Sequence, residues 1–387
     1  MSFIVQDIPV SNIHLTFVTV FTSIVLLLLF WDSIVDPILM SIFYSSSSST
    51  LNHKTVLITG AARRKGIGYA LASSFLNQGC HVILWDIDEK ALLLAKQTLS
   101  LESGTPTTKT TTATTATTAT PSLSRLQRIT TQVVDVSNSK AVHIAATQLQ
   151  KQQKRTIHIL VNNAGIVNGK SMLHLNSKDV QKTYNVNVLS QYFSISEFLP
   201  KMIQNKKGLI ITISSMMGMM GGANLADYCG SKWALLGLDE SLRMELRRSG
   251  TNAKGIRTLV VCPYMVNTGM FRGAFGEKNG KNKEHTNRST SMLRGGMNRL
   301  RDVLIPKLSP ETVANNVVVA AGRLMLPNGT CCSCNARGKI MILPSRLSLV
   351  PSLLRLLPIG LQEIILDLGG GTMGMNDFQG HTDVKKD

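Results

Sequence analysis

The chain is short of aromatic side chains, of acidic residues and of paired cysteine motifs. Phe, Trp and Tyr make up only 5% of its 387 residues, which is little for a protein that stacks nucleic-acid bases. Asp and Glu number 23 against 41 Lys and Arg, so the formal net charge is +18. Such a charge favours nucleic acid or the anionic face of a membrane as a partner. The six cysteines do not supply the two CxxC pairs of a zinc site, and a disulfide scaffold is not expected.

The apolar content is ample by comparison. Hydrophobic residues make up 43% of the chain, beside 30 glycines and 12 prolines. This composition excludes collagen-like and wholly disordered chains, and it leaves enough apolar material for a core. The length is more than one average domain needs and less than three domains need.

The first apolar run without a charge extends over seventeen residues, 15–31. As a helix it would be about 26 Å long at about 1.5 Å per residue, close to the thickness of a hydrocarbon core. With the weaker apolar stretch 34–44 it makes either one span or a shallow hairpin. A cleaved signal peptide and a buried core helix are the alternatives. A signal peptide has Lys or Arg before its apolar run, and no such residue precedes this one. We expect residues 1–44 to be a membrane anchor and residues 45–51 a linker.

After the linker, short apolar runs alternate with longer amphipathic stretches. The runs predict strands at 56–58, 81–85, 129–134, 157–161, 209–213 and 258–262, and the stretches predict helices at 69–78, 88–99, 139–151, 178–202 and 228–248. Strands separated by helices of this length predict a parallel sheet covered on both faces. The Thr-, Ala- and Pro-rich stretch 104–122 interrupts the pattern, and we expect a disordered insertion because it cannot bury enough apolar surface.

A glycine-rich turn, TGAARRKGIG at 59–68, directly follows the first predicted strand. Its three glycines let the backbone approach a pyrophosphate, and the following helix offers free N–H groups and the positive end of its dipole. Asp86 ends the second predicted strand, eighteen residues past Gly68, where a carboxylate accepts the hydroxyls of an adenosine ribose. A plain loop and a solvated Asp are the alternatives, but the combination favours a dinucleotide site.

A tyrosine and a lysine lie four residues apart near the start of a predicted helix. This spacing puts Tyr228 and Lys232 on one face. An ammonium beside a phenol favours the phenolate, so the tyrosine can exchange a proton with an alcohol as hydride leaves or returns. Ser215, thirteen residues earlier, ends a strand where its hydroxyl can hold the reacting oxygen. Such a Tyr-Lys pair is common by itself and becomes specific only in combination.

That combination resembles the short-chain dehydrogenase/reductase family. The glycine-rich turn, NNAG at 162–165, Ser215 and the YCGSK stretch follow the order and spacing of that family. The resemblance covers about residues 52–272. DYCGSK at 227–232 and VCPYMVNTGMFRG at 261–273 are similar to one branch, the membrane-associated retinol dehydrogenases and the 17β-hydroxysteroid dehydrogenases of lipid droplets. An N-terminal hydrophobic anchor fits that branch too.

The resemblance implies an α/β fold, with a Rossmann-like doubly wound parallel sheet in a single catalytic domain at residues 52–345. A variable substrate lid would occupy residues 270–305, and residues 346–387 would form an amphipathic segment and a polar tail. The lid includes the Lys- and Arg-rich stretch 277–301, which lies either against anionic lipid headgroups or in solvent. The apolar stretches of 347–368 either touch the membrane or pack on the domain.

The resemblance also assigns roles to single residues. Tyr228 would be the acid/base, and Lys232 would lower its pKa and contact the ribose. Ser215 would polarise the substrate oxygen, and Asn187 would hold the water of a proton relay. The cofactor-binding positions would be Thr59, Gly60, Gly66, Ile67, Gly68, Asp86, Asp135, Asn162, Ala164, Gly165, Tyr228, Lys232 and Thr268. No metal is implied, and a homodimer through the helices bearing Asn187 and Tyr228 is an expectation from the resemblance.

The sequence departs from the family at the first turn. Five residues, 61–65, separate its first two glycines, where the family has three. Asp86 favours NAD, because a carboxylate repels a ribose 2′-phosphate, whereas the basic side chains of the turn leave NADP open. Gly230 stands where Ala is more usual. The methionines after Ser215 either line the substrate pocket or fill the core, and they are Met216, Met217, Met219 and Met220.

Three functions follow, in this order. The first is a membrane-anchored NAD(P)-dependent oxidoreductase of the endoplasmic reticulum or lipid droplet, which interconverts a lipophilic alcohol and its carbonyl, retinoid or steroid by family precedent. The second is a catalytically weak or inactive lipid-surface protein that retains the fold, an alternative kept open by the altered turn. Nucleic-acid binding comes last and is not expected, because no nucleic-acid motif accompanies the positive charge.

Overall fold

The computed structural model describes residues 50–102, 125–152, 156–271, 307–326, 338–348 and 350–368. The predicted anchor, the Thr-rich insertion and the basic stretch 277–301 lie outside these residues, so they remain predictions. Within the described ranges, no helix has both the length and the apolar character that crossing a bilayer requires.

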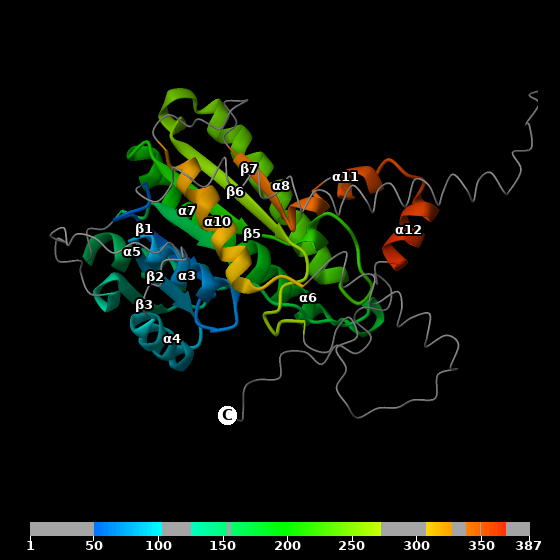
Figure 1. Cartoon of the computed structure of the whole chain (residues 1–387), viewed down its shortest axis with the longest axis horizontal. Coiled ribbons are helices and arrows are strands. Elements are labelled where there is room, and N and C mark those ends of the chain that lie inside the picture. Colours follow the sequence, from blue (N-terminus) through cyan, green and yellow to red (C-terminus); the bar gives the residue numbers. More distant parts are fainter. Residues whose placement is uncertain are drawn as a thin grey trace, which may run out of the picture.

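A seven-stranded sheet forms the centre of the described structure (Figure 1). Its strands are β1 (Thr55–Thr59), β2 (His81–Asp86), β3 (Ile129–Val133), β4 (Ile159–Asn162), β5 (Gly208–Ile213), β6 (Ile256–Pro263) and β7 (Gly338–Leu343). All neighbouring strands pair in parallel, in the order β3-β2-β1-β4-β5-β6-β7. The predicted parallel sheet is therefore confirmed. The strand order reverses between β1 and β4, and in such sheets ligands bind beyond the carboxyl ends of the strands at this place.

Helices cover both faces of the sheet. The α-helices before the C-terminal segment are α3 (Ile67–Asn77), α4 (Glu89–Leu101), α5 (Ser139–Gln152), α6 (Ser177–Tyr184), α7 (Ser190–Gln204), α8 (Ala226–Arg248) and α10 (Pro310–Leu324). Side chains of α3, α4 and α10 form one apolar core with the sheet, whereas those of α5, α7 and α8 form a second core. The chain is thus wound on both sides of the sheet, as expected.

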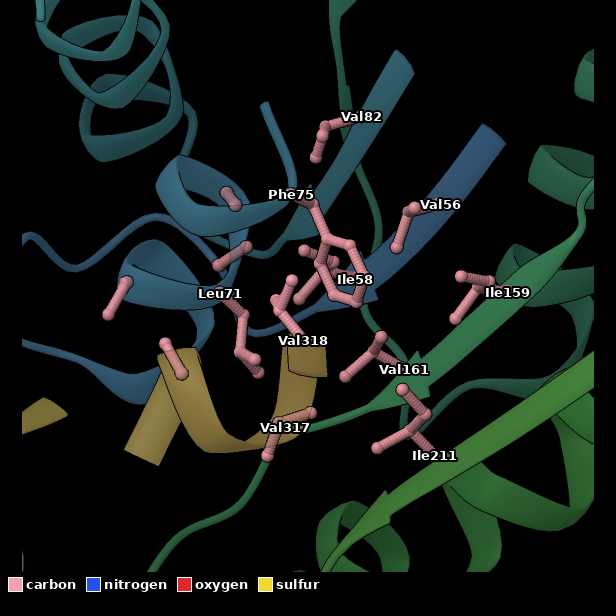
Figure 2. Packing of buried hydrophobic residues seen from close by; sticks show 14 of the residues in the cluster. Val56, Ile58, Leu71, Phe75, Val82, Ile159, Val161, Ile211, Val317 and Val318 are labelled. Carbon is pink, nitrogen blue, oxygen red and sulfur yellow. The ribbon is translucent and has the colours of Figure 1, made fainter. Parts of the chain in front are cut away.

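Alternate residues of each strand supply the two cores. Val56 and Ile58 of β1 point toward Phe75 of α3 and Val318 of α10, as Figure 2 shows. Leu57, between them, belongs to the opposite core. A strand buried on both faces is apolar throughout, which explains why the sequence shows short uninterrupted apolar runs instead of alternation.

The structure differs from the predicted elements at several places. The helix predicted at 178–202 consists of α6 and α7, joined by one π-helical turn, η4 (Asn185–Leu189). The sequence pattern also missed β7 and α10. Five of the six β7 residues are half-buried or exposed, as expected of an edge strand, although residues 340–343 form a short apolar run that was not predicted as a strand.

The C-terminal segment contains two short helices, α11 (Val350–Leu354) and α12 (Ile359–Leu368). Pro351 and Leu354 of α11 are buried. The Arg355 guanidinium lies 4.4 Å from the centroid of the Trp233 ring, so the end of α11 contacts α8. In Figure 1, α12 lies at the periphery of the molecule.

One half-buried histidine, His158, joins the beginnings of β1 and β4. His158 Nδ1 accepts a hydrogen bond of 3.1 Å from the Thr55 N–H. Burial lowers the pKa of His158 to about 4, and the nearby Lys54 and Lys207 act in the same direction. The folded chain therefore keeps this imidazole neutral at pH values at which an unfolded chain protonates it.

We predict that His158 makes the fold acid-sensitive. Between about pH 6.5 and pH 4 the unfolded state binds a proton that the native state does not, so stability should fall as the pH falls through this window. The His158→Asn variant, whose amide oxygen can still accept from Thr55, should lose thermal stability less steeply. Melting temperatures from pH 8 to pH 4 measure this, with the exposed His174→Asn as control. Equal slopes for His158→Asn and the wild type would contradict the prediction.

Candidate active site

The glycine-rich turn connects β1 to α3 at the carboxyl end of the sheet. Gly60 has φ +64°, and a Cβ there would lie 2.8 Å from Ala164 Cα. A Cβ on Gly68 would lie 2.5 Å from the Gly60 carbonyl oxygen and 2.6 Å from Asn163 Nδ2. Real Cβ atoms do not approach backbone this closely, so the turn requires glycine at both positions.

The turn is joined to the end of β4 by four hydrogen bonds. Thr59 Oγ1 accepts from the N–H groups of Asn163 and Ala164, each at 3.0 Å. Asn163 Nδ2 donates to the carbonyl oxygens of Thr59 and Gly60 at 2.8 and 2.9 Å. Sequence reasoning did not select Asn163, although its place in the NNAG stretch was a usable signal.

A backbone hydrogen bond closes the end of the five-residue stretch between the first two glycines. The Gly66 N–H donates to the Arg63 carbonyl oxygen at 2.8 Å. The next residue, Ile67, begins α3, and no side chain caps this helix at Gly66. The first N–H groups of α3, at Ile67 and Gly68, therefore stand at the predicted position with the positive end of the helix dipole.

Asp86 anchors this turn as well as ending β2. Its Oδ2 accepts from the Ala62 N–H at 2.9 Å, and its Oδ1 accepts from the N–H groups of Ile87 and Asp88 at 2.8 and 3.3 Å. Beyond the end of the neighbouring β3, Asp135 Oδ1 accepts from the N–H and the hydroxyl of Ser137. The two carboxylates thus lie at the ends of adjacent strands. The role of Asp86 at the ribose is a prediction from the sequence pattern, and that of Asp135 near the adenine is implied by the family resemblance.

Three other predicted cofactor residues are Asn162, Gly165 and Thr268. Asn162, the last residue of β4, is buried, and its Oδ1 accepts from Ser194 Oγ of α7 at 2.7 Å. This hydrogen bond connects the central strand β4 to α7. Thr268 follows β6 and its Oγ1 accepts from the Met270 N–H at 3.3 Å. Gly165 lies beside the catalytic candidates, because a Cβ there would be 3.4 Å from Lys232 Nζ.

Asn187 lies in the π-helical turn η4 and is fully buried. Its Oδ1 accepts from the Ile166 N–H at 2.8 Å, and its Nδ2 donates to the Ile166 carbonyl oxygen and to Ser231 Oγ at 3.0 and 2.9 Å. Ser231 Oγ in turn donates to the Tyr228 carbonyl oxygen at 2.7 Å. Single π-helical turns occur frequently at functional sites. Ser231, which sequence reasoning did not select, connects Asn187 to the tyrosine.

The structure brings the predicted tyrosine, lysine and serine together. Lys232 Nζ donates to the Ile213 carbonyl oxygen at 3.0 Å and lies 5.6 Å from the centroid of the Tyr228 ring. Ser215 begins the short turn after β5, and its Oγ accepts from the Met217 N–H at 3.2 Å. Its hydroxyl proton is therefore available to a partner other than the backbone.

Burial dominates the ionisation of both central groups. It raises the pKa of the Tyr228 phenol above its ordinary value of 10, while the hydrogen bond with Ser215 acts in the opposite direction. It lowers the pKa of the Lys232 ammonium to about 8. Desolvation causes both shifts, because it disfavours the charged form of each group. The expected lowering of the Tyr228 pKa by Lys232 stays a prediction.

Apolar side chains enclose the phenol. Tyr228 is 4% exposed and packs in a cluster with Val167, Leu225 and Cys229. The Phe271 ring lies edge-on, with centroids 5.7 Å apart and planes at 85°. Met217 packs against this cluster, whereas Met216 is 1% exposed and fills the interior. The methionines after Ser215 thus contribute to both the site and the core.

Comparison with known proteins identifies relatives. A family model described as short chain dehydrogenase matches residues 107–279. Short-chain dehydrogenase/reductase family 16C member 6 of Bos taurus is 34% identical over 218 residues, which cover 56% of this chain and 60% of that protein. Epidermal retinol dehydrogenase 2 of Mus musculus is 33% identical over 244 residues, 62% of this chain and 69% of that protein. Retinol dehydrogenase 10-A of Danio rerio is 32% identical over 221 residues, 56% and 62% of the two chains.

Solved structures agree on the fold. A short chain dehydrogenase/reductase from Burkholderia phymatum in complex with NAD has a TM-score of 0.57 and 22% identity, covering 82% of this chain and 96% of that chain. An alcohol dehydrogenase from the archaeon Thermococcus sibiricus, complexed with 5-hydroxy-NADP, has a TM-score of 0.52 and 18% identity, covering 76% and 96%. The chain spans 60–69% of the length of the curated relatives named above. By its identity to these relatives, the chain belongs to the short-chain dehydrogenase/reductase family.

Proposed function

We propose that this protein is an NAD(P)-dependent oxidoreductase that interconverts a lipophilic alcohol and its carbonyl by hydride transfer. The observation that carries the proposal is the convergence of Tyr228, Lys232, Ser215 and Asn187 beside the glycine-rich turn. Ser215 lies just after β5, Asn187 in η4, and Tyr228 and Lys232 in α8, and they meet at the carboxyl end of the sheet, where α/β folds bind ligands.

The residues around the turn fit a dinucleotide. The glycines let the turn pack closely against the end of β4, and the first N–H groups of α3, which no side chain caps, can donate to a pyrophosphate. Asp86 ends β2 and Asp135 lies beyond the end of β3, where an adenosine would lie. A bound nicotinamide cofactor supplies or accepts the hydride. Gly165 and Lys232 line the side of the site next to Asn187, with Lys232 offering a donor to a ribose hydroxyl.

The chain's own residues move and hold the proton. In reduction, the Tyr228 phenol, which burial keeps protonated, donates its proton to the carbonyl oxygen as that oxygen becomes negative. The Ser215 hydroxyl donates a hydrogen bond to the same oxygen. In oxidation the Tyr228 phenolate, which the neighbouring Lys232 ammonium (pKa about 8) stabilises, takes the proton from the alcohol and becomes the phenol.

The apolar wall around Tyr228 favours a lipophilic substrate. Val167, Leu225, Met217 and Phe271 surround the phenol, and they have no charged group to bind a polar substrate tail. Several relatives are named retinol dehydrogenases, so a retinoid is the first substrate to test, with a 17β-hydroxysteroid second. A catalytically weak or inactive lipid-surface protein is the alternative, favoured by the enlarged turn.

Membrane anchoring by residues 1–44, at the endoplasmic reticulum or lipid droplet, is part of the proposal. It is supported by the uncharged apolar run 15–31. A homodimer through the helices that carry Asn187 and Tyr228 is proposed from family membership alone.

Tyr228→Phe should abolish turnover and leave cofactor binding intact. Loss of the proton donor should lower kcat/KM for retinal reduction about 10²- to 10⁴-fold, the usual contribution of general acid catalysis. NADH and NADPH binding, followed by nicotinamide fluorescence, should change little because the ring remains. Tyr192→Phe, on the half-exposed side of α7, serves as the control. Near-normal turnover by Tyr228→Phe would remove this residue from the mechanism.

Asp86→Asn should shift cofactor preference toward NADPH. The amide can still accept from the Ala62 N–H, so the turn should stay closed while the negative charge near a 2′-phosphate disappears. We expect the ratio of the two dissociation constants, Kd for NADPH over Kd for NADH, to fall about tenfold, which is about 1.4 kcal/mol. Asp88→Asn removes the same charge two residues away and should leave the ratio closer to that of the wild type. An unchanged ratio in Asp86→Asn would show that another group reads the ribose.

Deletion of residues 1–44 should release the protein from membranes. Flotation of the full chain and of the deletion variant on a density gradient, with liposomes of neutral and anionic lipid, measures the association. The full chain should float with both kinds of liposome, and the deletion variant should stay at the bottom. Continued flotation of the deletion variant would place the membrane contact elsewhere.

A further inference from the structure

Two hydrogen-bonded contacts connect the segment α6–η4 to α8. Thr183 Oγ1 donates to Asp227 Oδ2 at 2.8 Å. One helical turn further along both helices, Asn187 Nδ2 donates to Ser231 Oγ at 2.9 Å. Asn187 lies four residues after Thr183, and Ser231 lies four residues after Asp227, so the two contacts are stacked one helical turn apart. Tyr228 directly follows Asp227 and precedes Ser231, and so it lies between them.

A third side chain completes the first contact. Asn168 Nδ2 donates to Asp227 Oδ2 at 2.7 Å and also contacts Thr183 Oγ1 at 2.9 Å. Asn168 belongs to the loop after β4, and its neighbour Val167 packs against Tyr228. The cluster of Asn168, Thr183 and Asp227, here the Asp227 cluster, therefore ties three segments of the chain together at the tyrosine.

The two helices approach closely at this point. A Cβ on Gly230 would lie 2.6 Å from the hydroxyl oxygen of Tyr184, the last residue of α6. Gly230 is the position where the family more often has Ala. The missing methyl group thus accommodates Tyr184, and it lets α6 and α8 meet without moving Thr183 away from Asp227.

Burial of the Asp227 carboxylate is difficult to explain by stability alone. Asp227 is 4% exposed and Thr183 is fully buried. Asp227 Oδ1 has no hydrogen-bond partner among the described residues. The dipole of the first turn of α8 favours a carboxylate, but a buried carboxylate oxygen without a donor opposes folding. The carboxylate instead fixes an orientation. It accepts hydrogen bonds from two segments, and these orient the start of the helix that carries Tyr228.

We propose that the Asp227 cluster is a positioning element for the catalytic tyrosine. Thr183 and Asp227 hold the first turn of α8 against α6, and they keep Tyr228 in register with the contact between Asn187 and Ser231. None of the three cluster residues touches the reacting atoms. The inference rests on the proposed oxidoreductase function, because it concerns the rate of that reaction.

The test compares Thr183→Val with Thr183→Ser. Valine has the shape of threonine but cannot donate to Asp227, whereas serine retains the hydroxyl. Displacement of a catalytic group by about 1 Å costs about 10²-fold in rate, so Thr183→Val should lower kcat for retinal reduction by about 10- to 100-fold. KM for retinal and Kd for NADH should each change less than about threefold. Thr183→Ser should recover most of kcat.

Asp239→Asn is the matched control for a buried carboxylate. Asp239 lies in the same helix, is also 4% exposed, and accepts a 2.8 Å hydrogen bond from Arg243 Nε far from the site. This variant should lower the melting temperature and leave kcat unchanged. Asn168→Ala, at a half-buried position, is the second variant if Thr183→Val does not fold, and it should lower kcat in the same way.

The outcomes distinguish the inference from the proposed function. Active wild-type protein with normal kcat in Thr183→Val, or in Asn168→Ala if the former does not fold, would overturn the positioning role and leave the oxidoreductase intact. A loss of kcat in Thr183→Val that Thr183→Ser fails to recover would also overturn it. Wild-type protein that turns over neither retinal nor a steroid ketone, with NADH or NADPH, would overturn the proposed function and the inference with it.

Discussion

The junction between the carboxyl ends of β1 and β4 is the constraint on which the site depends. The Thr59 hydroxyl and the Asn163 amide satisfy the backbone groups that the two strands leave free as they diverge. Unpaired backbone groups in a buried position are strongly unfavourable, so these side chains decide whether the turn can close here. Once it closes, Gly68 lies against Gly60, and α3 begins directly after the turn with no side-chain cap at Gly66.

The same junction explains how the enlarged turn is accommodated. The extra length is taken up by the bond from the Gly66 N–H to Arg63 and by the bond from the Ala62 N–H to Asp86. Asp86 thereby holds the turn in place, in addition to its predicted role of binding the ribose hydroxyls. These two hydrogen bonds hold the longer turn at both of its ends.

Burial also governs the ionisation of the proposed catalytic residues. Tyr228 and Lys232 lie in one apolar surrounding, which favours the neutral form of each. A protonated phenol suits reduction, and a lysine that titrates near pH 8 suits stabilisation of a phenolate in the reverse direction. The π-helical turn at Asn187 and the stacked contacts to α8 set the geometry, so polar positioning and apolar burial act on the same tyrosine.

The sequence by itself determined the features that depend on local spacing and composition. These include the parallel sheet, the glycine-rich turn, the carboxylate after β2 and the Tyr-Lys pair on one helix face, since period and position along the chain define them. The edge strand β7 was missed although its last four residues are apolar, because a short apolar run by itself does not distinguish a strand from part of a helix. Only the tertiary structure shows the hydrogen bonds of Asn163, Thr183 and Asp227, and that burial raises the pKa of Tyr228. Each of these depends on burial and on partners distant in the sequence, because neighbours brought together by folding leave no mark in local spacing.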